Sequence, residues 1–109
     1  LLDAGIPTAL STDAPFGDAD PWAAMRAAVH RTTGSGAVLG ADERIDAGTA
    51  LRMFFGTADR PTRPRTVEPG QPADLCVLSA PPDRVLRELS AELVSATIVG
   101  GKPVYQKPV

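Results

Sequence analysis

Two consecutive glycines, Gly100 and Gly101, constrain the fold of this chain more than any other local feature. They separate an apolar, β-favouring segment, residues 94–99, from a second strand candidate, residues 102–105. A two-residue link leaves no length for a crossover, so the two strands can pair only in the antiparallel sense. The favoured two-residue turns need positive φ angles, which glycine adopts without steric cost. The sequence therefore predicts a β-hairpin over residues 94–105.

The second half of the chain carries further strand signals ahead of this hairpin. Residues 73–78 form an apolar run that predicts a buried strand, and we expect Cys76 within it to be a small core residue. Residues 66–68 favour another short strand, followed by a Pro-Gly pair that suits the centre of a type II turn. A short helix is predicted over residues 84–90. This half of the chain is therefore expected to be rich in β-structure.

The first half instead alternates between strand and helix. Residues 6–12 are mostly apolar and predict a short buried strand. Asp20 can cap a helix that has Pro21 at its first position, where the missing N–H has no cost. Asp46 is the next plausible N-cap, for a helix that ends near Gly56. An alternation of strand and helix is typical of α/β folds.

Composition excludes several classes of function. The chain has 109 residues, of which 43% are hydrophobic and 22% charged, as in globular proteins. The net charge of −2 excludes a generally basic, nucleic-acid-binding surface. The 109 residues show no signal-peptide pattern and no run of about 18 apolar residues that could span a membrane. One cysteine allows no internal disulfide and fits a reducing compartment, so we expect a cytoplasmic protein with neither nucleic acid nor membrane as partner.

Three arginines, Arg60, Arg63 and Arg65, cluster in a proline-containing stretch. This stretch is either a solvated linker stiffened by proline or an arm that binds phosphate or a partner. The sequence leaves both interpretations open.

Asp13 is the main candidate for chemistry. It directly follows the predicted strand at residues 6–12, and barrel enzymes keep their catalytic groups at the C-terminal ends of strands, before a βα loop. Asp13 is therefore our candidate metal ligand and proton carrier, and Pro15, Phe16 and Gly17 could line a substrate entrance. The alternative is a structural role, in which Asp13 caps the following turn or forms an Asx-turn before Pro15.

Several ordered stretches resemble the C-terminal part of the metal-dependent amidohydrolase superfamily. Ser-Thr-Asp-Ala-Pro at residues 11–15 is similar to a segment on the last barrel strand of the large amidohydrolases that have a composite β domain. The other similar stretches are residues 20–31, 45–51, 67–78 and 99–105. Each stretch is short, but the series covers essentially all 109 residues in the order of the family.

The resemblance implies a fold between α/β and α+β. Residues 1–65 would be the last strand–helix unit of a (β/α)8 barrel, and residues 66–109 part of a small C-terminal β-sandwich, the composite domain. It also implies hydrolysis of a non-peptide C–N bond in a small-molecule substrate: an amide, a cyclic amide or a deamination. One or two divalent metals, with zinc expected, would sit at the barrel mouth beside Asp13.

The other metal ligands of the family are absent from this sequence. The family needs an H-x-H pair and further ligands on earlier strands, and the single histidine, His30, matches none of them. We therefore expect a fragment of a longer enzyme that is inactive alone and binds no metal tightly. Unpaired strand edges predict self-association into a homo-oligomer. The alternative is a small non-catalytic module for interaction or structure.

Overall fold

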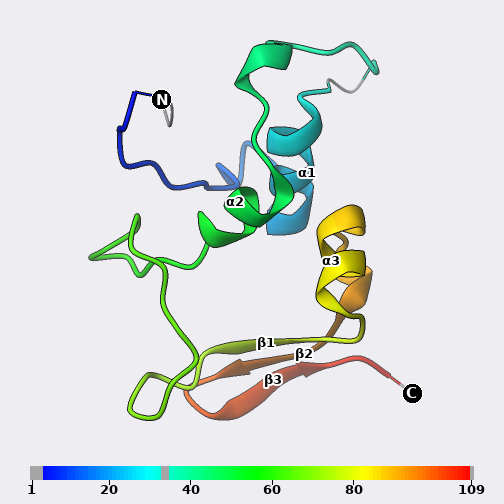
Figure 1. Ribbon diagram of the computed structural model, residues 1–109. Helices are drawn as coiled ribbons and strands as arrows, with labels where there is room; N and C mark the ends of the chain where they lie inside the picture. Colours follow the sequence, from blue (N-terminus) through cyan, green and yellow to red (C-terminus); the bar gives the residue numbers. More distant parts are fainter. Residues whose placement is uncertain (1–3, 33–34, 109) are drawn as a thin grey trace. The chain divides into compact units, whose positions relative to one another are not determined.

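The computed structural model describes residues 4–32 and 35–108. The chain divides into two compact units, Leu1–Arg65 and Thr66–Val109 (Figure 1). Helices dominate the first unit and an antiparallel sheet the second, so the chain is of mixed α/β class. The assignment of the units to a barrel end and to a composite β domain stays a prediction.

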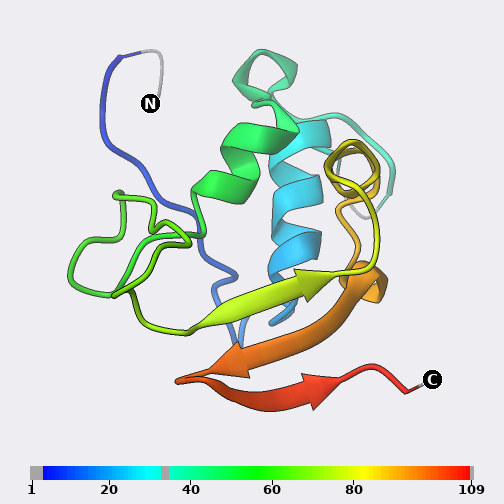
Figure 2. The same ribbon diagram turned by 60° about the horizontal axis from the view of Figure 1, so that its bottom comes forward.

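The first unit is built around two helices that pack side by side, α1 (Pro21–His30) and α2 (Ala47–Arg52) (Figures 1 and 2). A short 3-10 helix, η1 (Ala41–Glu43), lies between them in the sequence. The small residues of both helices allow a close approach of their backbones. The buried apolar side chains of this unit are Trp22, Met25 and Ala50.

Both predicted N-caps are confirmed. Asp20 Oδ1 accepts a hydrogen bond from the Trp22 amide over 2.9 Å, and Asp46 Oδ1 accepts one from the Thr49 amide over 2.8 Å. Each bond satisfies a backbone donor that a helix leaves without an internal partner. The predicted end of the second helix was wrong, because α2 stops at Arg52 rather than near Gly56. The Met53 amide still bonds four residues back, to the Thr49 carbonyl, but the amides of Phe54 and Phe55 bond three residues back, which tightens the chain out of the α-helix.

The predicted strand at residues 6–12 was wrong. This segment is irregular, and its contact with the rest of the unit includes one backbone hydrogen bond, from the Leu10 amide to the Met53 carbonyl over 3.2 Å. A strand exists only when a neighbour satisfies its backbone groups. Among the described residues of this unit, the β-pairing is an isolated bridge between Thr32 and Val38, so residues 6–12 have no sheet to join.

The second unit contains a three-stranded antiparallel sheet with the order β1-β2-β3. Its strands are β1 (Leu75–Leu78), β2 (Val94–Val99) and β3 (Lys102–Gln106). Helix α3 (Pro82–Glu88) and the 3-10 helix η2 (Ala91–Leu93) connect β1 to β2. The buried apolar side chains are Val85, Leu89, Leu93 and Val94.

The predicted hairpin is confirmed. Val99 pairs with Lys102, and the two linking glycines have φ angles of 56° at Gly100 and 81° at Gly101. Positive φ at both central residues is the signature of a type I′ turn, whose twist matches that of the flanking strands. β1 is fixed against this turn, because the Gly101 amide donates to the Ala73 carbonyl over 3.0 Å.

The other predictions for this unit were less accurate. Residues 66–68 form no strand, although the predicted turn after them does form, with the Gln71 amide bonded to the Glu68 carbonyl over 3.2 Å. The helix expected at residues 84–90 begins two residues earlier, at Pro82, because proline suits the first helical turn.

Cys76 is exposed, whereas the sequence predicted a core residue. Within β1, Leu75 and Leu78 are half-buried while Cys76 and Val77 are exposed. β1 belongs to an antiparallel sheet, and such a sheet can leave one face open to solvent, so an apolar run in it need not be buried on both faces. Partial desolvation still raises the pKa of the Cys76 thiol, which keeps it in its unreactive form at neutral pH.

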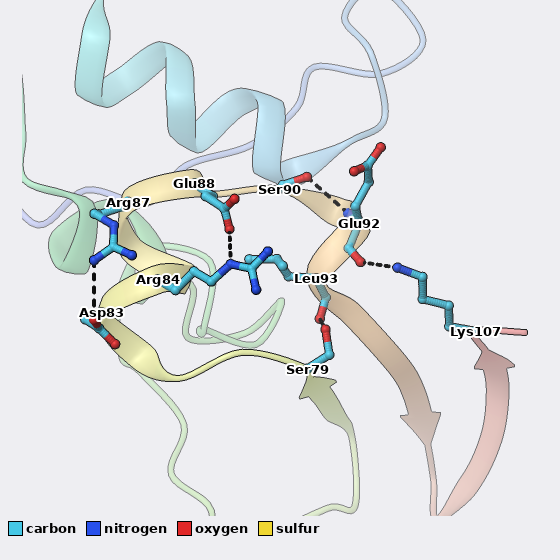
Figure 3. Close-up of polar contacts among 9 residues, drawn as sticks. All are labelled: Ser79, Asp83, Arg84, Arg87, Glu88, Ser90, Glu92, Leu93 and Lys107. Atoms are coloured by element: carbon cyan, nitrogen blue, oxygen red, sulfur yellow. Dashed lines mark hydrogen bonds and ion pairs between the residues drawn. The ribbon is translucent and has the colours of Figure 1, made fainter. Parts of the chain in front are cut away.

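Polar contacts hold the connection between β1 and β2 (Figure 3). The Ser79 amide and hydroxyl both donate to the Leu93 carbonyl, over 2.8 and 3.1 Å. Lys107 Nζ donates to the Glu92 carbonyl over 2.6 Å and so fixes the chain that follows β3. The exposed ion pairs along α3, Arg84–Glu88 and Arg87–Asp83, add only about 0.2–0.5 kcal/mol each.

None of the helices in the described part of the chain has the length and apolar character needed to cross a membrane.

Candidate functional site

The predicted site residues lie together in one loop, between the irregular segment at residues 6–12 and α1. Asp13 is exposed and has a φ of 58°, in the left-handed region that few non-glycine residues adopt. Its carbonyl accepts a hydrogen bond from the Gly17 amide over 2.9 Å. Its amide donates to Ser11 Oγ over 3.4 Å, a weak contact. These two bonds close a compact turn around the Asp13 backbone.

Gly17 supplies the amide whose hydrogen bond closes the turn around Asp13. A β-carbon at position 17 would overlap the carbonyl oxygen of Thr12, well inside van der Waals contact. The obstacle is backbone rather than a flexible side chain, so it cannot simply move aside. The structure gives Gly17 a close backbone contact, and its predicted role in lining a substrate entrance stays a prediction.

The side chains of this loop are open to solvent. Phe16 is 93% exposed, and Asp13 and Pro15 are exposed as well. A carboxylate in this setting is accessible to a ligand that approaches the loop. A large exposed aromatic ring beside it offers apolar surface to the same ligand.

Two further carboxylates in the loop have structural partners. Asp18 Oδ1 accepts a hydrogen bond from the Asp20 amide over 3.0 Å, and Asp20 in turn caps α1. The predicted cap role of Asp20 is therefore confirmed, Asp18 supports it, and Asp13 remains the candidate for chemistry.

The described residues do not make a metal site by themselves. Within residues 4–32 and 35–108, no group of three or more His, Cys, Asp or Glu side chains is placed to hold a metal ion. His30 is exposed at the end of α1, and its backbone carbonyl accepts a hydrogen bond from Arg44 Nε over 3.1 Å. Asp13 offers one suitable oxygen ligand, but the set around it does not fit a bound metal.

The sequence did not indicate the hydrogen bonds and the ion pair that Arg31 makes. Its guanidinium donates to the Leu39 carbonyl from Nε and pairs with Glu43 Oε2, both over 2.9 Å. The Leu39 amide donates back to the Arg31 carbonyl over 2.7 Å. These contacts fix the loop after α1 to the end of that helix. Leu39 and Glu43 lie 8 and 12 positions after Arg31 in the sequence. No spacing rule for helices or turns links residues this far apart, so these contacts could not be predicted.

Among the residues that the structure describes, two carboxyl groups have a perturbed pKa, and both act in local structure. The backbone amide and the hydroxyl of Thr49 lower the pKa of Asp46 below its ordinary value. The Thr57 hydroxyl lowers the pKa of Asp59 in the same way, over a 2.6 Å hydrogen bond. Hydrogen bonds to a charged carboxylate favour that form, and both residues are accounted for by their threonine neighbours.

The arginine cluster is partly engaged by the backbone. The Arg65 amide and its Nε both donate to the Phe55 carbonyl, over 3.1 and 3.2 Å. These bonds give Arg65 a role in fixing the connection after α2. The two interpretations of this stretch, as a solvated linker or as a binding arm, both stay predictions.

Comparison with known proteins identifies the family. The sequence profile of the amidohydrolase family matches residues 1–105. The chain belongs to the amidohydrolase family. The resemblance inferred from the short ordered motifs is thereby confirmed, and the matched region includes the whole Asp13 loop.

A curated protein is similar to nearly the whole chain. The chain is 36% identical over 112 residues to an N-substituted formamide deformylase of Arthrobacter pascens. The alignment covers 98% of this chain and 21% of the relative, so the chain spans about a fifth of the relative's length. No solved structure gives a significant match. Members of this superfamily are generally metal-dependent hydrolases.

Proposed function

We propose that this segment is the C-terminal part of an enzyme that hydrolyses a non-peptide C–N bond in a small molecule. The bond belongs to an amide or a cyclic amide, or is cleaved in a deamination. The observation that carries the proposal is the family match over residues 1–105. Similarity to a deformylase of N-substituted formamides supports the same bond type.

In this proposal Asp13 carries the proton. Hydrolysis breaks an O–H bond of water and the C–N bond, and it forms a C–O bond and an N–H bond. The Asp13 carboxylate takes the proton from the attacking water and returns it to the leaving nitrogen, as general acid–base catalysis requires. Its exposure and its place in a compact loop support this role.

We propose metal binding only for the gene product that carries this segment. The resemblance implies a divalent metal, with zinc expected. Asp13 would be one of its ligands. Because the described residues supply no group of three ligands, no step of the mechanism is assigned to the metal here.

The test is the substitution Asp13→Asn in the gene product, assayed with an N-substituted formamide and with other simple amides. Asparagine keeps the size of the side chain but cannot carry the proton, so turnover should fall to background. Asp18→Asn is the matched control, because it neutralises a second carboxylate of the same loop and should leave turnover near wild type. Full activity of Asp13→Asn on every substrate cleaved by the wild type contradicts the proposal.

For residues 1–109 alone we propose no catalytic activity and self-association. The described residues lack a metal site, and β1 and β3 are the edges of an open sheet that can pair with another copy. Light scattering that shows a stable monomer contradicts the self-association. We also propose a cytoplasmic location, which the single cysteine supports. If no amide is cleaved by the gene product, the non-catalytic module becomes the better interpretation.

A further inference from the structure

We infer that Gly17 is a positioning residue for Asp13: its lack of a side chain and its amide together hold the Asp13 backbone in the conformation that presents the carboxylate. The inference rests on the proposed function, because it matters for activity only if Asp13 takes part in the reaction.

The first observation is the hydrogen bond between the two residues. The Gly17 amide donates to the Asp13 carbonyl over 2.9 Å, a good length for an N–H···O bond. This bond restrains the peptide that follows Asp13. The contact on the other side, from the Asp13 amide to Ser11 Oγ, is 3.4 Å long and restrains the backbone less. Gly17 is therefore the stronger of the two restraints.

The second observation is the space around Gly17. The Thr12 carbonyl, one residue before Asp13, occupies the volume where a β-carbon of residue 17 would lie. The backbone on both sides of Asp13 is thus packed against Gly17. Any larger residue must push the Thr12 carbonyl away, and the Asp13 backbone must move with it.

The third observation is the strained backbone of Asp13. Its φ of 58° is unfavourable for a residue with a β-carbon and relaxes unless its surroundings hold it. The β-carbon direction, and with it the place of the carboxylate, depends on this angle. When the Gly17 contact is lost, Asp13 can relax to an ordinary extended or helical conformation and its carboxylate swings away.

The experiment is the substitution Gly17→Ala in the gene product, with kcat and KM measured per folded molecule. A displacement of a catalytic group by about 1 Å can reduce the rate about 100-fold, so we expect a fall in kcat of that order with KM nearly unchanged. Gly56→Ala is the matched control. A β-carbon at Gly56 overlaps the Pro61 carbonyl just as severely, but this contact lies in the connection after α2. Gly56→Ala should lower stability and keep kcat per folded molecule.

The outcomes separate the inference from the proposed function. If Asp13→Asn retains full turnover, the proposed function fails whatever Gly17→Ala does. If Asp13→Asn is inactive and Gly17→Ala has the kcat of Gly56→Ala, the proposed function stands and the positioning role of Gly17 is overturned.

A second measurement decides the question if Gly17→Ala does not fold. Amide hydrogen exchange of the wild-type protein, resolved by residue, compares Gly17 with its neighbours Phe16 and Asp18. The Gly17 amide should exchange more slowly, because it donates to Asp13. Equal exchange at the three amides overturns the inference.

Discussion

The carboxylate of Asp74 accepts a hydrogen bond from the amide of Gly100, 26 residues later in the chain, over 2.8 Å. Asp74 immediately precedes β1, and Gly100 is the first residue of the turn between β2 and β3. The bond therefore links one edge strand of the sheet to the hairpin that forms the other edge. No local sequence pattern links residues 26 positions apart, so this contact could not be predicted from the sequence.

We predict that Asp74→Ala loosens the hairpin turn. The Gly100 amide loses its acceptor, and a hydrogen bond of this kind contributes about 1 kcal/mol at an exposed site. Exchange of the Gly100 amide should accelerate about fivefold, since that factor corresponds to about 1 kcal/mol of local opening free energy. Glu68→Ala removes another exposed carboxylate of the same unit and should leave the exchange of Gly100 unchanged. Equal exchange in Asp74→Ala and the wild type contradicts this role.

Substitutions at the two glycines of the hairpin should have different effects on the stability of the fold. Gly100→Asn is expected to be nearly neutral, because Asn-Gly is a favoured type I′ pair. Gly101→Val should cost about 1–2 kcal/mol, because a β-branched residue is strained at the observed φ of 81°. There is room for a side chain, with the nearest atom, the Ala73 β-carbon, 4.0 Å from an added β-carbon, so backbone strain alone is tested. Denaturant unfolding of the two variants measures the difference, and equal stabilities would rule out a type I′ turn.

Local signals predicted the features that depend on neighbouring residues and failed for those that need a distant partner. The hairpin followed from Gly100 and Gly101, because a two-residue turn carries its own conformational requirement. The caps Asp20 and Asp46 were found for the same reason, since each satisfies donors within its own first turn. The strand at residues 6–12 was predicted from apolar character, but a strand needs a partner, and that partner is not a local property.

The candidate site residues are a prediction from the sequence, whereas their backbone geometry had no signal in it. Asp13, Pro15, Phe16 and Gly17 were named from their place after an apolar segment, and the structure puts them in one loop. The left-handed backbone of Asp13 and its closure on Gly17 depend on a contact between backbone groups, which the sequence does not encode in any simple pattern. The role of these residues in a reaction stays a prediction.

The N-cap of α2 should make stability depend on pH in acid. Donation from the Thr49 amide, and then from its hydroxyl, lowers the folded-state pKa of Asp46 below its ordinary value of 3.8. The unfolded chain therefore binds the proton more tightly, so the stabilisation is present above pH 3.8 and is lost as the pH falls through the lower folded pKa. The stability difference between the wild type and Asp46→Asn should shrink below about pH 4. Thermal unfolding between pH 7 and pH 3 measures it.

Thr49→Val provides the control for this pH dependence. Valine keeps the backbone amide and removes the hydroxyl, so the pKa of Asp46 should rise part of the way to its ordinary value. The pH-dependent part of the stability should then be smaller than in the wild type but still present. A pH dependence that is identical in Thr49→Val and the wild type would show that the hydroxyl contributes nothing.

Phe16 should affect substrate binding without affecting stability. Its ring is 93% exposed, so Phe16→Ala removes almost no packing from the folded chain and should leave the unfolding midpoint unchanged. If the ring covers an apolar part of the substrate, its loss removes part of the 1.5–3 kcal/mol of a fully buried Phe, which raises KM about tenfold with kcat nearly constant. Val67→Ala, at a side chain that is 85% exposed, is the control and should change neither quantity. A KM that stays at the wild-type value for substrates with small and with large apolar groups contradicts a substrate contact for Phe16.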